Sequence, residues 1–307
     1  MLNGILPLYK PRGMTSFDCV AKIRRLYQTR KVGHSGTLDP NVDGVLPICI
    51  GNATKVVQFL VAYGKEYQGS ITLGFATTTE DLDGEEIARQ AVTEPFTNDE
   101  IDAALAQMTG AITQIPPMFS AVKVNGRRLY DYARNGETVE RPERHVTISS
   151  FKQRQAATYD PATQTQTIYF TVACSKGTYV RTLAVDVGKV LGVPAVMSDL
   201  TRLKSGGFTL DETVTFEEIA AHVEAGTAGT LLAPIDKALG QYPRVTLTDE
   251  QWQRVKNGAF ITAAEGQQTD PDANTMVALV YQNSLKCLYS YRPDEQRYKP
   301  FKMFAVN

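Results

Sequence analysis

Cysteine and histidine are scarce in this chain of 307 residues. Its four cysteines lie far apart, none of them belongs to a CxxC pair, and only three histidines accompany them. A disulfide framework or a structural zinc site needs more ligands at closer spacing. The sequence therefore predicts no metal site and a reducing, cytoplasmic compartment.

Long apolar runs are also missing. No stretch approaches the roughly 18 consecutive apolar residues that a membrane-spanning helix needs. The apolar stretch from Leu2 to Tyr9 is interrupted by Asn3 and Pro7, and it lacks the basic leader and small-residue cleavage site of a signal peptide. We therefore expect neither secretion nor a membrane partner.

The overall charge has no strong sign, but the local charge is uneven. Lys and Arg total 32 against 33 Asp and Glu, which excludes a protein coated with basic side chains. Residues 1–31 and 120–155 are rich in Lys and Arg, whereas Glu80–Asp102 contains nine acids and one Arg, so we expect that segment to face away from any anionic partner. The two basic segments favour one anion-binding surface, although ordinary solvated faces would explain the charge pattern equally well.

The periodicity of apolar residues predicts a mixed α+β protein. Helical spacing runs from an N-cap at Thr15 to about Arg30, over residues 98–108 and over residues 180–191. Enrichment in β-branched and aromatic residues predicts strands such as 66–73 and 167–174. Helices and strands do not alternate strictly, and neither GxGxxG nor GxxxxGK[ST] occurs, which disfavours dinucleotide-binding and P-loop folds. We expect a mixed, largely antiparallel central sheet flanked by helices.

A small β-rich domain is predicted at the C-terminal end. Gly240 and Pro243 interrupt the chain within residues 236–244, which marks a boundary. Beyond it, the pattern predicts a strand at 244–247, a helix at 250–256, and strands at 276–281 and 285–291 joined at Asn283-Ser284. The predicted domains are residues 1–240 and residues 245–307.

The densest candidate for chemistry is the segment Gly33–Pro40, which reads GHSGTLDP. Two glycines and a proline define a tight loop, and Pro40 biases Asp39 toward an extended backbone, which fixes the direction of its carboxylate. An Asp-Pro pair by itself more often only caps a turn. This segment alone therefore does not establish an active site.

Four motifs together resemble one family. They are Lys10–Ser16 (KPRGMTS), Gly33–Pro40, Gly64–Tyr67 (GKEY) and Lys176–Thr182 (KGTYVRT). Their order and separations resemble those of the TruB family of tRNA pseudouridine synthases, over about residues 4–240. Four motifs in register are far more specific than one short pattern.

The resemblance implies a pseudouridine synthase fold and an isomerisation that needs neither cofactor nor metal. Such an enzyme cuts the N1–C1′ bond of a uridine, turns the base and rejoins it through C5, here at uridine 55 in the T loop of tRNA. Asp39 matches the essential aspartate, acting as nucleophile or base. Arg181 matches its cationic partner, which should keep the carboxylate ionised where water is excluded. Tyr67 matches the tyrosine that packs against the target base.

The resemblance also implies an RNA-binding surface for the T arm of tRNA. A thumb-like insertion near residues 117–145 would grip the RNA, and residues 245–307 would form a PUA-like RNA-binding domain. His34 is expected to fill the space that the target base leaves, rather than to act as an acid. Nothing in the sequence demands an oligomer, so we expect a monomer. The expected RNA contacts are His34, Lys10, Tyr179, Lys123, Arg127, Arg128 and Arg134.

Two other functions stay open at this point. Val42-Asp43 stands where the family more often has Ala-Thr, which places Asp43 four residues after Asp39. The two acids could form the carboxylate pair of a glycosidase-type hydrolase. The basic segments would also suit an RNA chaperone that performs no chemistry.

Overall fold

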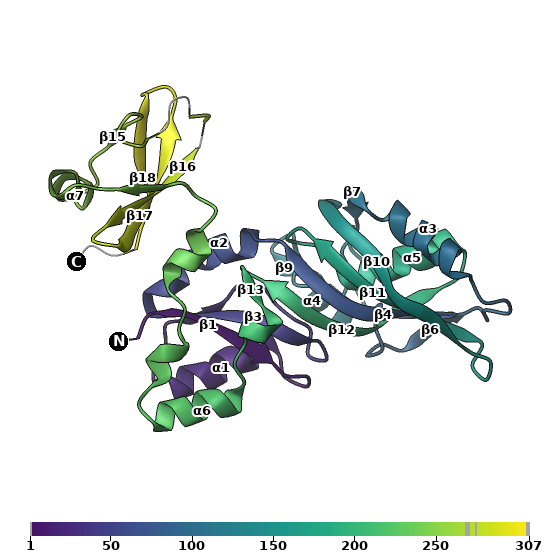
Figure 1. Ribbon diagram of the computed structural model, residues 1–307. Helices are drawn as coiled ribbons and strands as arrows, with labels where there is room; N and C mark the ends of the chain where they lie inside the picture. The colour runs from purple at the N-terminus through teal and green to yellow at the C-terminus, as the bar shows by residue number, and fades with distance from the viewer. Residues whose placement is uncertain (1, 268–270, 274, 305–307) are drawn as a thin grey trace.

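The chain folds around one large mixed sheet (Figure 1). A computed structural model describes residues 2–267, 271–273 and 275–304. The strand order is β1-β3-β12-β4-β11-β10-β7, with β2 paired to β3 and β13 paired to β12. Among the described strands of this sheet, only β3 and β12 pair in parallel, which confirms the expected mixed, largely antiparallel sheet. The bounds are β1 Gly4–Lys10, β2 Val32–His34, β3 Asp43–Ile50, β4 Lys65–Leu73, β7 Gly110–Gln114, β10 Arg144–Asp160, β11 Thr165–Cys174, β12 Ala195–Ser205 and β13 Phe208–Thr209.

Two groups of helices pack against this sheet. Helices α3 and α5 share a core with β4, β10, β11 and β12, whereas α1 and α6 share one with β1, β2 and β3. The side chains of β1 alternate between two cores, since Leu6 and Leu8 pack with α1 while Ile5 packs on the other side. The helices are α1 Ser16–Leu26, α2 Val57–Ala62, α3 Asn98–Gln107, α4 Leu129–Arg134, α5 Val180–Leu191, α6 Phe216–Glu224 and α7 Asp249–Val255, with 3-10 turns at η1 Gly51–Val56, η2 Leu210–Glu212, η3 Ala228–Leu231 and η4 Ile235–Leu239.

Helix α1 begins where the sequence predicts and ends earlier. The backbone N–H of Asp18 donates to Thr15 Oγ1 (3.0 Å), and the N–H of Thr15 donates to Asp18 Oδ2 (2.9 Å), which completes a capping box. The helix ends at Leu26 instead of near Arg30. Gln28 adopts a positive φ of 49°, and a right-handed helix cannot continue through that conformation.

The other predicted elements of the larger domain match closely. Residues 98–108 and 180–191 form α3 and α5, and residues 66–73 and 167–174 lie within β4 and β11. None of the helices in the described part of the chain is long and apolar enough to cross a membrane.

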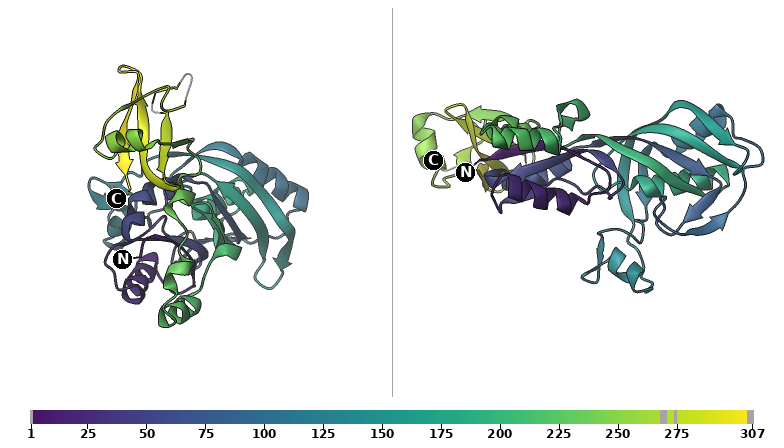
Figure 2. Two further views of the ribbon diagram at one scale, coloured as in Figure 1. Left: turned by 60° about the vertical axis from the view of Figure 1, so that its left-hand side comes forward. Right: turned by 90° about the horizontal axis from the view of Figure 1, so that it is seen from below.

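Two small hairpins extend from the large sheet. The first pairs β5 (Phe75–Thr77) with β6 (Glu86–Arg89). The second pairs β8 (Lys123–Val124) with β9 (Arg127–Arg128). Its turn residues, Asn125 and Gly126, both have positive φ, at 51° and 83°. This hairpin and α4 form a small projecting unit, clearest in the right-hand view of Figure 2, which we call the thumb (residues 117–143).

The C-terminal module (residues 244–304) is a five-stranded sheet with helix α7, β-rich as predicted. It has its own core, which includes Trp252 and Tyr289. The turn between β16 and β17 lies one residue earlier than predicted, because Gln282 and Asn283 take the positive φ angles. The strand order is β14-β16-β17-β18-β15, with bounds β14 Arg244–Thr246, β15 Ile261–Thr262, β16 Met276–Tyr281, β17 Ser284–Arg292 and β18 Arg297–Met303.

Candidate active site

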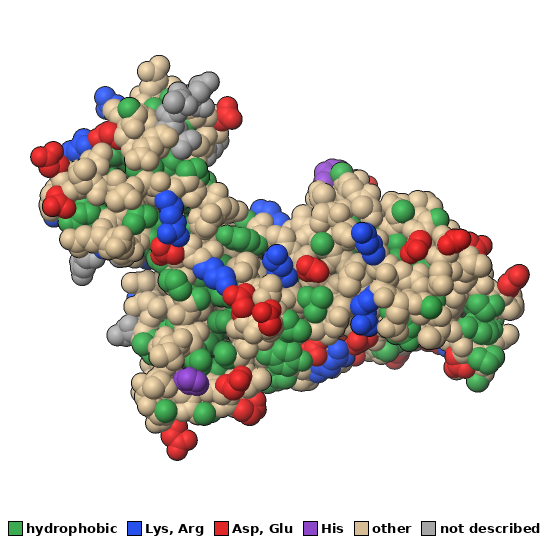
Figure 3. All heavy atoms as spheres, in the orientation of Figure 1, with side chains coloured by type: hydrophobic (Ala, Val, Ile, Leu, Met, Phe, Trp, Pro, Cys, Tyr) green, Lys and Arg blue, Asp and Glu red, His purple; other side chains and the backbone are tan. Residues whose placement is uncertain are grey.

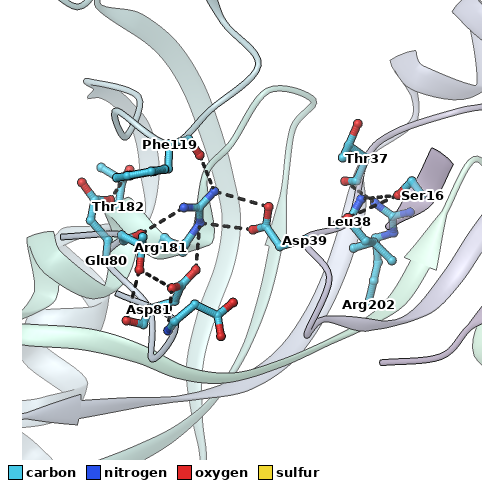
Figure 4. A network of polar contacts seen from close by, with 12 residues as sticks. Ser16, Thr37, Leu38, Asp39, Glu80, Asp81, Phe119, Arg181, Thr182 and Arg202 are labelled. Carbon is cyan, nitrogen blue, oxygen red and sulfur yellow. Dashed lines mark hydrogen bonds and ion pairs between the residues drawn. The ribbon is translucent and has the colours of Figure 1, made fainter. Parts of the chain in front are cut away.

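The segment between β2 and β3 forms the loop that carries Asp39. Gly36 adopts a φ of +147°, a conformation that side chains of L-residues rarely allow. Leu38 is buried, and its backbone N–H donates to Ser16 Oγ (2.9 Å), so the start of α1 anchors the loop. Beyond this anchor, the side chain of Asp39 points toward Arg181 on α5 (Figure 4).

A fully buried arginine fixes the same loop from β12. Arg202 donates from Nη2 to the carbonyl of Gly36 (3.2 Å), from Nη1 to that of Thr37 (3.4 Å) and from Nε to that of Val45 (2.8 Å). The sequence analysis missed this residue, because the groups of the loop that it holds are main-chain carbonyls distant in sequence, which no side-chain motif reveals.

Lys10 does not occupy the position expected for an RNA contact. Its side chain is fully buried, and Nζ donates to the carbonyls of Pro11 (3.0 Å), Pro40 (2.9 Å) and Val42 (2.7 Å). All three ammonium donors are therefore occupied inside the protein. The predicted phosphate contact of Lys10 is wrong for this structure. Lys10 instead holds the backbone of the residues that follow Asp39 in the chain.

Arg181 and Asp39 form the ion pair that the sequence predicts. Arg181 Nε lies 3.2 Å from Asp39 Oδ2, and Nη2 donates to Oδ1 over 3.4 Å. The arginine side chain is 7% exposed, whereas that of Asp39 is 40% exposed. The guanidinium also donates to the carbonyls of Thr79 and Phe119, each over 3.0 Å. A fixed cation thus orients a carboxylate that still opens to solvent on one side.

The surroundings of Asp39 raise its pKa. Burial is the largest cause, and the charges of Asp81 and Asp83 act in the same direction. Arg181 lowers the pKa of Asp39 but does not fully offset these effects. The expectation that a cation stabilises the ionised form is therefore met only in part, and the carboxylate is more basic than an ordinary aspartate.

Arg181 is shared with a second acid that the sequence analysis missed. Asp81 Oδ2 lies 3.6 Å from Arg181 Nε, and Asp81 Oδ1 accepts from the backbone N–H of Asp83 (3.1 Å). Figure 4 shows Arg181 between Asp39 and Asp81. Asp81 belongs to the acidic segment 80–102, which we expected to face away from an anionic partner. That expectation is wrong for the start of the segment, which reaches the centre of the site.

Tyr67 lies on β4 and is nearly buried in the core beneath this loop, together with Leu38. Burial raises the pKa of Tyr67, while the charge of Arg202 and a hydrogen bond with it lower that pKa. The charge of Asp39 also acts on Tyr67. The structure therefore brings the predicted Tyr67, Asp39 and Arg181 to one site from three different segments.

His34 ends β2 and is half-buried. Its Nδ1 accepts a hydrogen bond from the backbone N–H of Gly36 (3.3 Å), and burial lowers its pKa, so the ring is neutral at pH 7. The ring of Phe17 meets it edge-on at a centroid distance of 5.6 Å and is 64% exposed. The neutral imidazole fits a stacking role better than proton transfer, and Phe17, which the sequence analysis did not single out as a site residue, extends the aromatic surface.

Tyr179 lies directly before α5, beside the base of the thumb. Its backbone N–H donates to Gln114 Oε1 (3.0 Å), and Gln114 Nε2 donates to its carbonyl (3.2 Å). Gln114 is the last residue of β7, and the thumb starts a few residues later. Together with the bond from Arg181 to the carbonyl of Phe119, this contact ties the thumb to the helix that carries Arg181.

Arg127 lies on the thumb and is partly neutralised. Its two terminal nitrogens donate to the carboxylate of Glu137 over 2.9 and 3.1 Å. The guanidinium also lies over the ring of Tyr132, 4.3 Å from its centroid.

The other predicted thumb cations differ in their partners. Arg128 donates to the hydroxyl of Tyr130 (2.7 Å), and Arg134 lies over the same ring, 5.3 Å from its centroid. Lys123 is exposed at the start of the hairpin. The structure therefore gathers Lys123, Arg127, Arg128 and Arg134 on the thumb, and Arg134 extends from it with an aromatic contact and an exposed charge.

Asp43 makes contacts of a structural kind. Its Oδ1 accepts from Thr201 Oγ1 (2.6 Å), and its Oδ2 accepts from the hydroxyl of Tyr9 (2.9 Å) and from Arg12 Nε (3.1 Å). These hydrogen bonds lower the pKa of Asp43 despite its partial burial. Both oxygens are occupied in tying β1, β3 and β12 together, which disfavours Asp43 as the partner of Asp39 in a hydrolase.

Potential metal ligands are dispersed. Across residues 2–267, 271–273 and 275–304, no three His, Cys, Asp or Glu side chains group closely enough to hold a metal ion. The four cysteines are buried and are not disulfide-bonded.

The fold is that of a pseudouridine synthase. A chain in the crystal structure of a Cbf5-Nop10-Gar1 complex superimposes with a TM-score of 0.72 and 26% identity, over 98% of this chain and 85% of that one. The family model "TruB family pseudouridylate synthase (N terminal domain)" matches residues 24–180, and "tRNA pseudouridylate synthase B C-terminal domain" matches residues 181–240.

The chain belongs to the TruB family of pseudouridylate synthases. It is 96% identical to the tRNA pseudouridine synthase B of Lactiplantibacillus plantarum over 307 residues, the full length of both chains. It is 60% identical to the protein of the same name from Levilactobacillus brevis, again over both full lengths. The family predicted from the four motifs is confirmed.

Proposed function

We propose that this protein converts uridine 55 in the T loop of tRNA into pseudouridine, with Asp39 as its essential carboxylate. The observation that carries the proposal is the Arg181–Asp39 ion pair, on a loop whose Leu38 shares one hydrophobic core with Tyr67. Membership of the TruB family and relatives that are named tRNA pseudouridine synthase B support the same reaction and the same class of RNA.

The reaction breaks the N1–C1′ bond of the uridine and forms a C5–C1′ bond. The hydrogen at C5 leaves as a proton, and N1 gains one, so atoms and electrons balance without a redox partner. Asp39 attacks C1′, attacks C6 or removes a ribose proton, and each route requires the ionised carboxylate. Since the same two fragments are separated and rejoined, the chemistry calls for neither cofactor nor metal.

The side chains around Asp39 suit an extruded nucleotide. Tyr67 offers a ring against which the uracil packs, and base–aromatic stacking contributes about 1–3 kcal/mol. His34 and the exposed ring of Phe17 offer an aromatic surface for the bases left behind in the RNA. These contacts offset part of the cost of extruding the base, which is a few kcal/mol.

The division of labour follows the two parts of the chain. Residues 1–240 act as the catalytic domain, and the thumb grips the T arm through Arg128, Arg134 and Lys123. Residues 245–307 act as a PUA-like domain that contacts RNA farther from the reacting uridine. The protein works as a monomer in the cytoplasm, where unmodified tRNA is available.

The test uses tRNA transcript tritiated at uridine C5, incubated with excess protein for a single turnover. We expect stoichiometric tritium release with pseudouridine mapped at position 55, and none with Asp39→Asn. Asp43→Asn should retain release because its carboxylate holds strands together instead of meeting the substrate. Free uracil, or equal inactivation by both substitutions in folded proteins, would favour the hydrolase. Tight binding without tritium release would favour the chaperone.

A further inference from the structure

Two basic side chains lie against the Gly36 turn of the loop that carries Asp39, and the charge of a third acts on one of them. Lys65 starts β4, Arg202 lies on β12 and Lys176 follows β11. Lys65 Cε and Arg202 Nη1 lie 3.5 and 3.7 Å from the point that a Cβ of Gly36 would occupy. The charges of Arg202 and Lys176 both act on Lys65. Since residue 36 has no side chain, both cations approach the backbone of the turn closely.

Lys65 lacks a partner for its charge within the described residues: its ammonium makes neither a hydrogen bond nor an ion pair there. The next residue, Glu66, cannot compensate it, because alternate residues of a strand point to opposite faces of the sheet. Glu66 pairs in register with Lys204, whereas Tyr67, on the face of Lys65, pairs with Arg202.

The surroundings penalise the charge on Lys65. Its pKa is lowered to about 8, chiefly by burial, and the positive charges of Arg202 and Lys176 are part of that lowering. Cys174, which pairs in register with Lys65 on β11, acts in the opposite direction. A half-buried cation among other cations is a site that an anion stabilises.

We propose that Lys65, backed by Arg202 and Lys176, binds a backbone phosphate of the RNA next to the nucleotide that enters at Asp39. The inference rests on the proposed function, because it takes an RNA strand as the occupant. An extruded nucleotide keeps its phosphates, and the loop that meets its base at Asp39 also meets the basic cluster at Gly36. A phosphodiester supplies the missing negative charge at that point without reading sequence.

Phosphate binding at Lys65 couples to proton uptake. A neighbouring negative charge raises the pKa of a lysine, so the bound complex keeps a proton that the free protein releases as the pH rises past about 8. Affinity for RNA therefore falls with rising pH in this range. His34, Cys174 and Tyr67 lie outside this range, since burial lowers the pKa of His34 and raises the pKa values of Cys174 and Tyr67. Burial also lowers the pKa of Lys10, and that residue is unchanged in every variant compared below.

The experiment measures the affinity of full-length protein for unmodified tRNA transcript in the Asp39→Asn background, so that no turnover intervenes. In Lys65→Met, the slope of log K against log salt should become shallower by about 0.7 to 0.9, the value of one phosphate contact. The fall in affinity between pH 7 and 8.5 should disappear. Lys65→Arg should restore the salt slope and remain insensitive to pH, because arginine stays charged. The matched control is Lys204→Met, an exposed lysine on the opposite face of the sheet.

An unchanged salt slope and pH dependence in Lys65→Met would overturn the proposal. A Lys65→Arg protein that keeps the pH dependence would also overturn the proposal. This comparison stays informative even if thermal melting shows that the Lys65→Met protein is unfolded. Inorganic phosphate, titrated at constant ionic strength, separates the two sources of the anion. Phosphate binding that depends on Lys65 while the tRNA slope does not would assign the site to a free anion, against the proposal. Tritium release by the wild-type protein is scored separately, so a failed synthase and a failed phosphate site give different results.

Discussion

At the scale of single residues, Arg181 does more than supply a positive charge. Its planar guanidinium contacts Asp39, the carbonyl of Thr79 and the carbonyl of Phe119 at the base of the thumb. A lysine ammonium cannot reproduce that geometry. We expect Arg181→Lys to lower the single-turnover rate by on the order of 100-fold, the scale of losing one positioned donor, while the tRNA dissociation constant changes far less. Rapid-quench tritium release and filter binding measure the two quantities, and a defect confined to binding would contradict this role.

The charge of Asp81 should shift the pH at which the reaction rate falls because Asp39 becomes protonated. The negative charge of Asp81 raises the pKa of Asp39, so Asp81→Asn should lower that pKa. Since the reaction needs the ionised carboxylate, the rate falls as the pH decreases through the pKa of Asp39. The midpoint of this fall should therefore lie at lower pH in Asp81→Asn than in the wild type. The measurement is the single-turnover rate between pH 4 and 7.

The matched control for this shift is Asp199→Asn, which removes a surface carboxylate paired with Arg12 at 2.6 Å. Its midpoint should equal that of the wild type. A wild-type midpoint in Asp81→Asn would mean that Asp81 only holds Arg181 in place and does not tune Asp39.

Residues with side-chain motifs were predictable, and residues that bond to the main chain were not. Asp39, Tyr67 and Arg181 stand in sequence motifs, and the structure brings them together. Arg202 gave no signal, because its acceptors are carbonyls more than 150 residues away. Lys10 stands in a motif, but its position in the sequence does not reveal that its three donors meet carbonyls of the loop.

At the scale of elements, the thumb separates two kinds of arginine. Arg127 forms a two-pronged pair with Glu137, so an RNA phosphate has to displace a carboxylate to reach it. Arg134 lies over Tyr130, with an exposed side chain. We expect Arg134→Gln to make the salt slope of tRNA affinity shallower by about one phosphate contact. Arg127→Gln should change it less, and Glu137→Gln should tighten binding. Equal effects of the two arginine substitutions would contradict this assignment.

Elements with a strong local signal were predicted accurately, and those set by tertiary contacts were not. The capping box of α1 and the apolar stripe of α5 made the starts of these two helices predictable. Both signals come from residues that are close together in the sequence. The predicted end of α1 was wrong, because Gln28 turns the chain toward β2 through a left-handed conformation. A glutamine in the sequence gives no indication of that conformation. The short hairpin of β5 and β6 also escaped prediction, although it brings Asp81 to the site.

At the scale of the whole molecule, the C-terminal module is not an independent appendage. One hydrophobic cluster contains Phe59 of α2 and Ile5 of β1 together with Leu288 and Phe304 of the module. Phe59 meets Phe304 at a ring-centroid distance of 6.3 Å. The basic side chains seen on the face in Figure 3 are scattered over both parts, with acids between them. This apolar contact therefore sets the position of the module relative to the domain that carries Asp39.

Deleting residues 245–307 should weaken tRNA binding and lower the melting temperature while leaving turnover at saturating RNA. The side chains that we propose for catalysis, and the residues that hold them, all lie before residue 245, which is why turnover should survive. The melting temperature should fall because Phe59 and its neighbours lose their apolar cover. Fluorescence melting, filter binding and single-turnover tritium release measure the three quantities on the same preparations.

A full-length Phe304→Ser protein separates docking from RNA contact, because it keeps every basic residue of the module and loosens only the apolar joint. If the module contacts RNA from a fixed position, this protein should bind tRNA with an affinity between those of the wild type and the deletion, and its turnover at saturating RNA should equal that of the wild type. Complete inactivity of a folded deletion would contradict an accessory role for the module. Wild-type affinity in the deletion would contradict any RNA contact by residues 245–307.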